Sequence, residues 1–279
     1  MQLPFVKMHG CGNDYIYFDC LKHTVPKPAS LAKQLSDRHF GIGGDGIVLI
    51  CPSSVAAARM RMYNADGSEG KMCGNAIRCV GKYLYDSGYC KKRQITVETA
   101  SGIKTLQMQI VGSRAVGATV DMGPPVWRPE QIPVDLPGAR VVGTPVKVGG
   151  RRYEITCLSM GNPHCVVFLP AVEQLDLVSL GRDFERSGLF PQGVNTEFVQ
   201  VLGPDQLRMR VHERGSGETL ACGTGACAAV CAAVAAGLCA RNTEVQVQLR
   251  GGALTVRYAP ETVYMTGPAE VAFTGTAEV

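Results

Sequence analysis

The sequence predicts an α+β fold of two pseudo-symmetric domains, each with a mixed or antiparallel β-sheet wrapped around one central buried helix. Three observations predict it. The chain has 279 residues, which exceeds the usual size of a single domain. Its second half repeats its first at a constant spacing, and in each half a Cys-Gly dipeptide stands before an apolar segment of helical length.

The repeat is clearest at two of the Cys-Gly dipeptides in the chain. Cys73-Gly74 and Cys222-Gly223 are 222 − 73 = 149 residues apart, and this offset holds without a gap over a long stretch. The residues that match at this offset include Gly12-Asn13 with Gly161-Asn162, Ser30-Leu31 with Ser179-Leu180, Gly44 with Gly193, Arg59-Met60-Arg61 with Arg208-Met209-Arg210, Glu69 with Glu218, Gly88 with Gly237, and Gly102 with Gly251. A constant register that includes an Arg-Met-Arg triplet indicates duplication.

Each repeat predicts the same elements in the same order. A first strand, residues 15–20 or 165–169, is followed by a helix, residues 31–39 or 180–186, with Ser30 or Ser179 as its N-cap. Two strands come next, residues 47–51 and 59–63 in the first half and 196–201 and 207–212 in the second. The central helix begins after each Cys-Gly and ends near Gly88 or Gly237. Hairpins follow, 96–98 with 104–110 and 245–249 with 253–258.

A proline-rich segment separates the two repeats, with five prolines between residues 124 and 137. We expect an N-terminal repeat of residues 1–122, completed by a C-terminal strand of residues 268–279. The C-terminal repeat then covers residues 123–267.

Composition limits the class of protein. The net charge of +4 arises from 28 basic and 24 acidic residues without basic blocks, so we expect no nucleic-acid partner. The first eight residues lack the apolar segment of a signal peptide, and the longest apolar stretch, residues 226–240, is too short to span a membrane. We therefore expect a cytoplasmic protein with no membrane partner, whose twelve cysteines are reduced and mostly in the core. No Cys-x-x-Cys pair is present, so we expect no metal site.

A cysteine at the start of a helix has a specific chemistry. The positive end of the helix dipole stabilises the thiolate and lowers the thiol pKa from its ordinary value of about 8.5. The free N–H groups after it suit a carboxylate. Two such sites that face one carbon suit racemisation, because one thiolate removes the α-proton and the other thiol returns a proton to the opposite face. The pattern predicts Cys73 and Cys222 as the catalytic pair, no cofactor, and carboxylate contacts from Gly74, Asn75, Gly223 and Thr224.

The repeat also shows where its symmetry is broken. Tyr15 is matched by His164, and Asn64 is matched by Glu213. Inversion needs one thiolate and one thiol at a time, so we expect His164 and Glu213 to tune the pKa values of the two cysteines. The alternative is that His164 is a core histidine and Glu213 a charge at the end of a strand.

At these residues the sequence resembles the diaminopimelate epimerases, which convert L,L-diaminopimelate to the meso isomer in lysine and peptidoglycan synthesis. The resemblance covers almost the whole chain and depends on HGCGNDYIYFD from His9, NADGSEGKMCGNAIRC from Asn64, GNPHCVVF from Gly161, GVNTEFV from Gly193 and HERGSGETLACGTGACA from His212. It implies two pseudo-symmetric domains, a cytoplasmic homodimer, diaminopimelate as substrate and no cofactor.

The resemblance also implies the site residues at matching positions. The base pair is Cys73 and Cys222, and the further substrate contacts are Asn13, Asn64, Asn162, Asn195, Glu213 and Arg214. These groups suit diaminopimelate, which carries two carboxylates and two ammonium groups. Some members carry glutamine where this chain has Gly46, so the side-chain contact of that position is absent here.

Three other interpretations fit the sequence less well. Gly41, Gly43 and Gly46 fit the spacing GxGxxG, but they follow a predicted helix and precede a strand, the reverse of the order in a dinucleotide site. A proline or hydroxyproline-type racemase of the same fold lacks the set of Asn64, Glu213 and Arg214 as it stands here. A non-catalytic amino-acid-binding relative is disfavoured because both cysteines are present.

Overall fold

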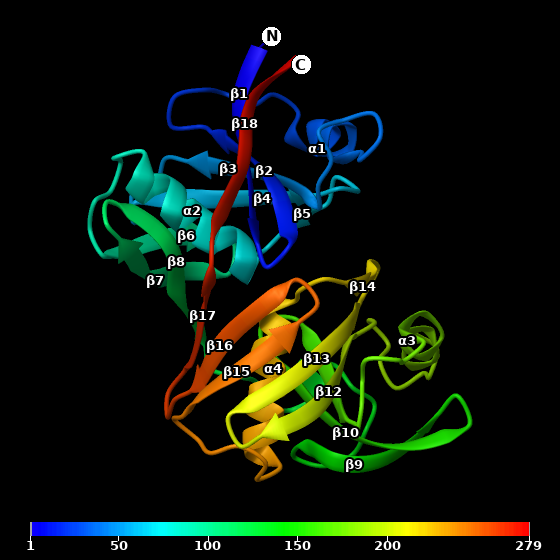
Figure 1. Ribbon diagram of the computed structural model, residues 1–279. Helices are drawn as coiled ribbons and strands as arrows, with labels where there is room; N and C mark the ends of the chain where they lie inside the picture. The colour runs from blue at the N-terminus through cyan, green and yellow to red at the C-terminus, as the bar shows by residue number, and fades with distance from the viewer. Residues whose placement is uncertain (1, 279) are drawn as a thin grey trace. The chain divides into compact units, whose positions relative to one another are not determined.

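The computed structural model describes residues 2–278, which divide into two compact units (Figure 1). The first unit contains the chain up to Asp121 together with the segment from Thr266 onward, and the second unit is Met122–Met265. The polypeptide therefore returns to the first unit at its C-terminal end.

The first unit is a mixed sheet with two helices. Its elements are β1 (Gln2–Gly10), β2 (Asn13–Asp19), α1 (Pro28–Ser36), β3 (Gly46–Cys51), β4 (Ala58–Asn64), β5 (Glu69–Gly70), α2 (Gly74–Asp86), β6 (Gln94–Thr99), β7 (Gly102–Val111), β8 (Arg114–Gly123) and β18 (Glu270–Glu278). β2 pairs with β3 and β4 with β6 in parallel, whereas β18 with β1, β1 with β2, β3 with β4, β6 with β7 and β7 with β8 are antiparallel.

The second unit has the same arrangement. Its elements are η1 (Pro129–Gln131), β9 (Val141–Val148), β10 (Arg151–Ser159), β11 (Pro163–Phe168), α3 (Leu177–Glu185), β12 (Asn195–Gly203), β13 (Gln206–Glu213), β14 (Gly217–Thr219), α4 (Gly223–Ala235), β15 (Glu244–Leu249) and β16 (Gly252–Tyr258). A further strand, β17 (Val263–Pro268), begins in the second unit and ends in the first. β11 with β12 and β13 with β15 are parallel; β9 with β10, β10 with β11, β12 with β13 and β15 with β16 are antiparallel.

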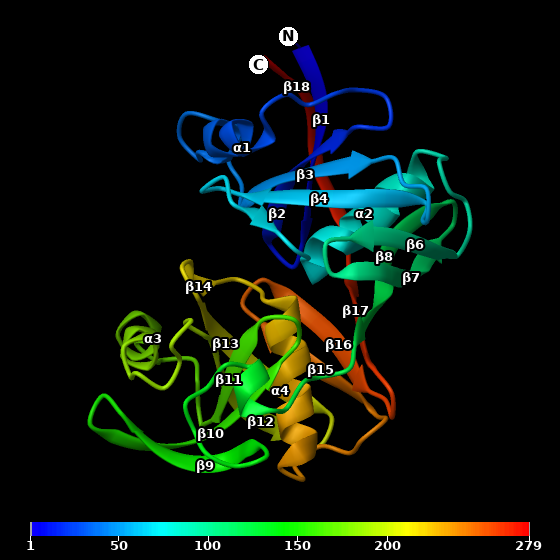
Figure 2. The ribbon, with the colours of Figure 1, turned by 180° about the vertical axis from the view of Figure 1, so that it is seen from behind.

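The sequence repeat is reproduced element by element. The helices α2 and α4 begin 223 − 74 = 149 residues apart, α1 and α3 begin 177 − 28 = 149 apart, and β1 and β10 begin 151 − 2 = 149 apart. In each unit the strands surround α2 or α4, as Figure 2 shows from behind. The predicted α+β fold of two pseudo-symmetric domains, each around a central helix, is confirmed.

The two central helices are buried in different ways. Helix α4 is rich in alanine and buries residues 225–233 without interruption, whereas α2 also buries two basic side chains, Arg78 and Lys82. Both helices end as predicted, before glycines at positive φ, Gly88 at 83° and Gly237 at 73°. The larger apolar side chains form a cluster in each unit, around Phe5 and Phe18 in the first and around Phe184 and Phe198 in the second.

The predicted serine N-caps are wrong. Helix α1 begins at Pro28, which supplies the helical φ at the first position, so Ser30 lies inside the first turn. Helix α3 is capped by Asp176, whose carboxylate accepts the N–H of Ser179 at 3.2 Å. Helix α1 also ends at Ser36 rather than at residue 39, because the Asp37 carboxylate accepts the N–H groups of His39 and Phe40 and turns the chain.

Several strands were not predicted, among them β1, β8, β9 and β10. β1 and β10 occupy equivalent places in the two units. β1 pairs with β18, which lies at the other end of the chain, and β10 pairs with β9, the strand directly before it. The proline-rich segment holds the short helix η1, and Val126 forms an isolated bridge with Ser159.

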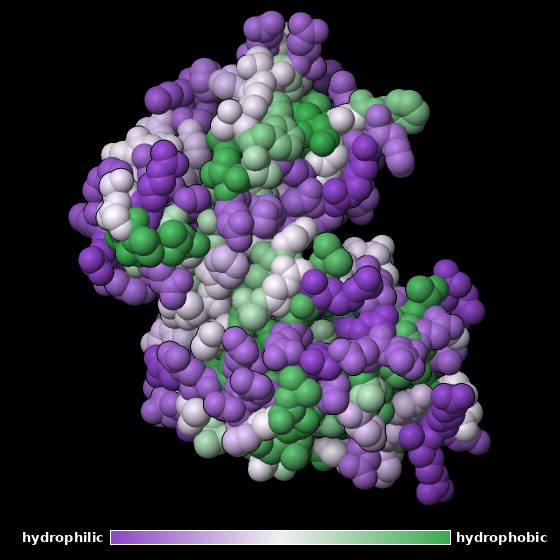
Figure 3. Space-filling view, viewed as in Figure 1, coloured by the Kyte–Doolittle hydropathy of each residue, from purple (hydrophilic) through white to green (hydrophobic). Residues whose placement is uncertain are grey.

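On the face shown in Figure 3, both units are largely hydrophilic with smaller hydrophobic patches. No helix within residues 2–278 combines the length and the hydropathy needed to cross a bilayer. All twelve cysteines are free thiols, and eight of them are buried.

Candidate active site

Both predicted catalytic cysteines lie at the N-termini of the central helices. Cys73 is the N-cap of α2, with φ −133° and ψ 123°, and its Sγ accepts the N–H of Ala76 at 3.4 Å. Cys222 is the N-cap of α4, with φ −117° and ψ 110°, and its Sγ accepts the N–H of Gly225 at 3.4 Å. The duplicated Cys-Gly motif therefore produces the same local geometry in each unit, a sulfur beside the first helical N–H groups.

In the first unit, Asn13 lies against the sulfur. Its Oδ1 accepts hydrogen bonds from Cys73 Sγ at 3.3 Å and from Asn75 Nδ2 at 3.2 Å. Its Nδ2 donates to Asp45 at 2.6 Å. Three of the predicted site residues, Asn13, Cys73 and Asn75, are therefore in direct contact.

Asn64 and Gly46 lie opposite each other in the ladder between β3 and β4. Asn64 Nδ2 donates to the hydroxyl of Ser68 at 3.0 Å. A Cβ atom added at Gly46 would lie 2.0 Å from the carbonyl oxygen of Tyr63, so a larger residue requires the backbone to shift. Position 46 thus supplies backbone only.

In the second unit, a buried histidine joins two other polar groups. His164 is fully buried; its Nε2 lies 3.0 Å from Asn162 Oδ1 and its Nδ1 lies 2.7 Å from Glu197 Oε1. His164 is also the register partner of Asn195 in the parallel ladder between β11 and β12. Asn162, His164 and Asn195 are therefore held together by adjacent strands.

The segment that leads to Cys222 is held by the remaining predicted residues. Asn195 Oδ1 accepts the backbone N–H of Arg214 at 2.9 Å, and the Arg214 guanidinium donates to the carbonyl of Gln192 at 2.8 Å. Glu213 accepts a hydrogen bond from the Thr219 hydroxyl. Thr224 Oγ1 lies 3.5 Å from Cys222 Sγ.

The charge environment of Cys222 differs from the one the sequence predicted. Burial, and then the negative charges of Glu213 and Glu197, raise the pKa of the Cys222 thiol well above its ordinary value, despite the hydrogen bonds from Thr224 and Gly225. The predicted lowering of the pKa by the helix terminus is wrong for this cysteine, because desolvation of the thiolate outweighs the helix dipole. Burial and the neighbouring carboxylates therefore favour the thiol form of Cys222 over the thiolate.

Sequence reasoning missed Glu197 and Asp45. Glu197 is fully buried, burial raises its pKa, and its Oε1 lies so close to Gly225 that a Cβ there would be 2.7 Å away. The repeat offset places Glu197 opposite Val48, since 197 − 149 = 48. This mismatch is the signal that could have identified Glu197, because the first repeat has an apolar residue of a buried strand at the same position.

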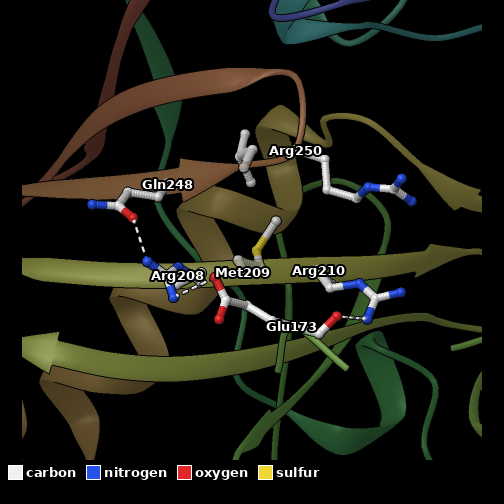
Figure 4. Close-up of a pocket in the computed structure, with 7 residues that line it drawn as sticks. Glu173, Arg208, Met209, Arg210, Gln248 and Arg250 are labelled. Carbon is white, nitrogen blue, oxygen red and sulfur yellow. Dashed lines mark hydrogen bonds and ion pairs between the residues drawn. The ribbon is translucent and has the colours of Figure 1, made fainter. Parts of the chain in front are cut away.

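A separate cavity of about 340 Å³ in the second unit involves the Arg-Met-Arg triplet (Figure 4). Its arginines are paired with neighbouring groups: Arg208 lies 2.8 Å from Glu173, and Arg210 makes two hydrogen bonds to Glu218. In the first unit Arg61 makes the equivalent pair with Glu69. The last arginine of each triplet therefore holds the short strand before each cysteine, β5 in the first unit and β14 in the second.

Comparison with known families agrees with this architecture. The family model for diaminopimelate epimerase matches residues 5–128 and 156–272. Proteins named diaminopimelate epimerase are 51% identical in Desulfovibrio desulfuricans, over 98% of this chain and 97% of the relative, and 49% identical in Acetivibrio thermocellus, over 99% of both. One from Methanococcus maripaludis is 47% identical, over 99% of this chain and 100% of the relative.

Solved structures share the fold at low identity. A crystal structure of a hydroxyproline epimerase from Agrobacterium vitis superposes with a TM-score of 0.73 at 15% identity, over 99% of this chain and 91% of the other. A predicted epimerase from Pseudomonas aeruginosa gives 0.70 at 16% identity, over 99% of both chains. The family-model match and the near-half identity over whole chains assign the protein: it belongs to the diaminopimelate epimerase family.

Proposed function

We propose that this protein is an isomerase that converts L,L-diaminopimelate to meso-diaminopimelate without a cofactor, in lysine and peptidoglycan precursor synthesis. The observation that carries the proposal is the duplicated cysteine at the N-terminus of each central helix, in a chain half identical to proteins with this name. Duplication supplies the two acid–base groups that inversion of one carbon requires.

In the proposed reaction Cys73 and Cys222 act on opposite faces of the α-carbon. One thiolate removes the α-proton, and the electron pair of the broken C–H bond moves into the carboxylate, which becomes enediolate-like. The N–H groups that follow each cysteine, those of Gly74, Asn75, Gly223 and Thr224, stabilise this charge. The other thiol then protonates the carbon from its side, so the thiol and thiolate exchange roles and no atoms are gained or lost.

The remaining predicted residues are proposed to hold the substrate. Their functional groups are complementary to two carboxylates and two ammonium groups, with Arg214 for an acid and amide oxygens or Glu213 for the ammonium groups. The proposed contacts are Asn13, Asn64, Asn162, Asn195, Glu213 and Arg214. His164 and Glu213 are proposed to tune the cysteines, and the charge of Glu213 on Cys222 supports this for Glu213.

Deuterium exchange tests the proposal. Incubation with L,L-diaminopimelate in heavy water should give deuterium at the α-carbon together with the meso isomer. Cys73→Ala and Cys222→Ala should each abolish epimerisation, whereas Cys90→Ala, a half-buried cysteine outside the site, should leave it unchanged. Exchange with proline or hydroxyproline but not with diaminopimelate would assign the chain to the racemase alternative.

We also propose that the protein is a cytoplasmic homodimer. Within each chain, we propose that each of the two compact units is one copy of the repeat. The outer strand β18 supports dimerisation, because Val271 and Phe273 on it are 47% and 48% exposed. Large exposed apolar side chains on one strand favour association. Phe273→Glu should shift the mass measured by light scattering from dimer to monomer; an unchanged dimer would exclude this face.

A further inference from the structure

The fully buried Arg78 of α2 is not among the residues to which the proposed reaction assigns a role. Its side chain is 0% exposed, and its guanidinium donates to the carbonyl oxygens of Gly74 at 3.0 Å and Pro268 at 3.1 Å. A further N–H donates to Asn75 Oδ1 at 2.9 Å. Burying a guanidinium is unfavourable unless its N–H donors are hydrogen-bonded. These hydrogen bonds therefore indicate that Arg78 does more than fill space in the core. The repeat places Cys227 at the equivalent position, since 78 + 149 = 227.

The contact with Asn75 begins a chain of hydrogen bonds with a defined direction. Arg78 can only donate, so Asn75 must turn its Oδ1 toward Arg78 and its Nδ2 toward Asn13. Asn13 then accepts with Oδ1 and donates with Nδ2 to Asp45, at 2.6 Å. The Asp45 carboxylate can only accept, so it holds the same orientation from the other end.

The end of this chain is the sulfur of Cys73. Asn13 presents its oxygen to Cys73 Sγ at 3.3 Å, where it accepts from the thiol, while the Ala76 N–H donates to the same sulfur at 3.4 Å. With the Asn13 amide reversed, an N–H would face the sulfur and would stabilise the thiolate instead. The orientation of one amide therefore biases the protonation of the proposed base.

We propose that Arg78 and Asp45 are positioning residues that fix the amide orientations of Asn75 and Asn13 and so hold an acceptor against the Cys73 thiol. Neither residue touches the reacting carbon in this scheme. Two other titratable groups near Cys73, Tyr17 and Cys79, are both buried, and burial raises their pKa values, that of Cys79 to about 11. They are neutral near pH 7 and do not reverse the effect of the amide.

The sign of one substitution separates orientation from charge. If Arg78 acted through its positive charge, Arg78→Met would raise the pKa of Cys73 and slow its alkylation. If Arg78 acts through the amides, the same change leaves Asp45 as the remaining group that holds the Asn13 amide, so a fraction of the amides reverses. The pKa of Cys73 then falls by up to about one unit, and alkylation speeds up by as much as about tenfold at a pH below that pKa. Asp45→Leu removes both the acceptor at the other end and a negative charge, whereas Asp45→Asn removes the charge and keeps an acceptor oxygen. Asp45→Leu should therefore speed alkylation more than Asp45→Asn does.

The measurement is the rate of iodoacetamide alkylation of Cys73 against pH, followed by peptide mass mapping, which separates this cysteine from the others. Arg38→Gln is the matched control, because it removes the solvent-side ion pair of Asp45 at 3.0 Å and leaves the bond from Asn13. This control should alkylate as the wild type does. No substrate is needed, so the result does not depend on which amino acid the enzyme inverts, although its catalytic meaning rests on the proposed role of Cys73.

A background substitution makes the test decisive. In an Asn13→Ala protein, Arg78→Met should not speed the alkylation of Cys73, and Asp45→Leu should speed it no more than Asp45→Asn does, because the amide that transmits the orientation is gone. The proposal would be overturned by slower or unchanged alkylation in Arg78→Met, by equal effects of Asp45→Leu and Asp45→Asn, or by a difference between these two variants that persists without Asn13. If Arg78→Met does not fold, as judged by circular dichroism, the comparison of Asp45→Leu with Asp45→Asn at this partly exposed site still decides the outcome.

Discussion

The duplicated Arg-Met-Arg triplet allows one interaction to be compared in two environments within one chain. Arg210 and Glu218 form a two-bonded pair whose side chains are 13% and 14% exposed. Arg61 and Glu69 form the same pair with side chains 37% and 44% exposed. We predict that Arg210→Met destabilises the protein much more than Arg61→Met does, since methionine keeps much of the side-chain length in both places.

The expected magnitudes follow from burial and from the groups left without partners. Breaking a largely buried ion pair costs about 3 kcal/mol, whereas an exposed pair contributes about 1 kcal/mol or less. Arg210 also donates to the carbonyl oxygens of Val172, Glu173 and Leu175, each at 2.9 Å, which lie ahead of α3. Arg250 lies 3.1 Å from Glu218 and still compensates part of the Glu218 charge when Arg210 is replaced. The expected cost is therefore at the lower end of the range for a buried ion pair.

Thermal and urea unfolding followed by circular dichroism measure the difference. At about 2–4 °C for each kcal/mol, Arg210→Met should lower the melting temperature by about 6–12 °C and Arg61→Met by at most about 4 °C. Equal losses in the two variants, or a larger loss in Arg61→Met, would refute the argument that burial sets the strength of this pair.

Three further predictions concern pH and packing. Hydrogen bonds and charges of Arg38 and Lys7 outweigh burial and hold the pKa of Asp14 below 3.8, so its stabilisation is present above that pH and lost below it; Asp14→Asn should flatten the acid limb of unfolding free energy against pH. The raised pKa of Cys222 means that unfolding releases a proton above about pH 9, so stability falls as pH rises there, and Cys222→Ala should lessen that fall in urea titrations. A Cβ at Gly181 would lie 2.2 Å from His212, so Gly181→Ala should lower stability by about 1–3 kcal/mol in urea unfolding, and an unchanged midpoint would contradict the overpacking.

The element pattern was predictable because hydrophobic period and glycine position are local signals. The central helices end at Gly88 and Gly237 as expected, since a residue at positive φ stops a helix wherever it occurs. The N-caps of α1 and α3 were not predictable from serine alone, because Pro28 and Asp176 compete for the same helix starts. The C-terminal strand was expected in the N-terminal repeat, but its partner β1 was not predicted, because pairing across the length of the chain has no local signature.

The cysteines and most asparagines of the candidate site were found because they recur at one offset or match family motifs. The sequence did not predict Glu197 and Asp45 as site residues, because they contact other side chains of the site. Their positions next to His164 and Asn13 follow only from the strand register and the turn before β3.

By itself the sequence determined the duplication, the family and the two cysteines at helix starts, because each depends on residue identity and spacing along the chain. Tertiary structure alone decided the electrostatic state of those cysteines. Burial and the charges of Glu213 and Glu197 raise the pKa of Cys222 and favour its thiol form, and Cys73 faces an amide oxygen. Solvation and the direction of a hydrogen bond depend on what surrounds a group in space, which residue spacing does not encode.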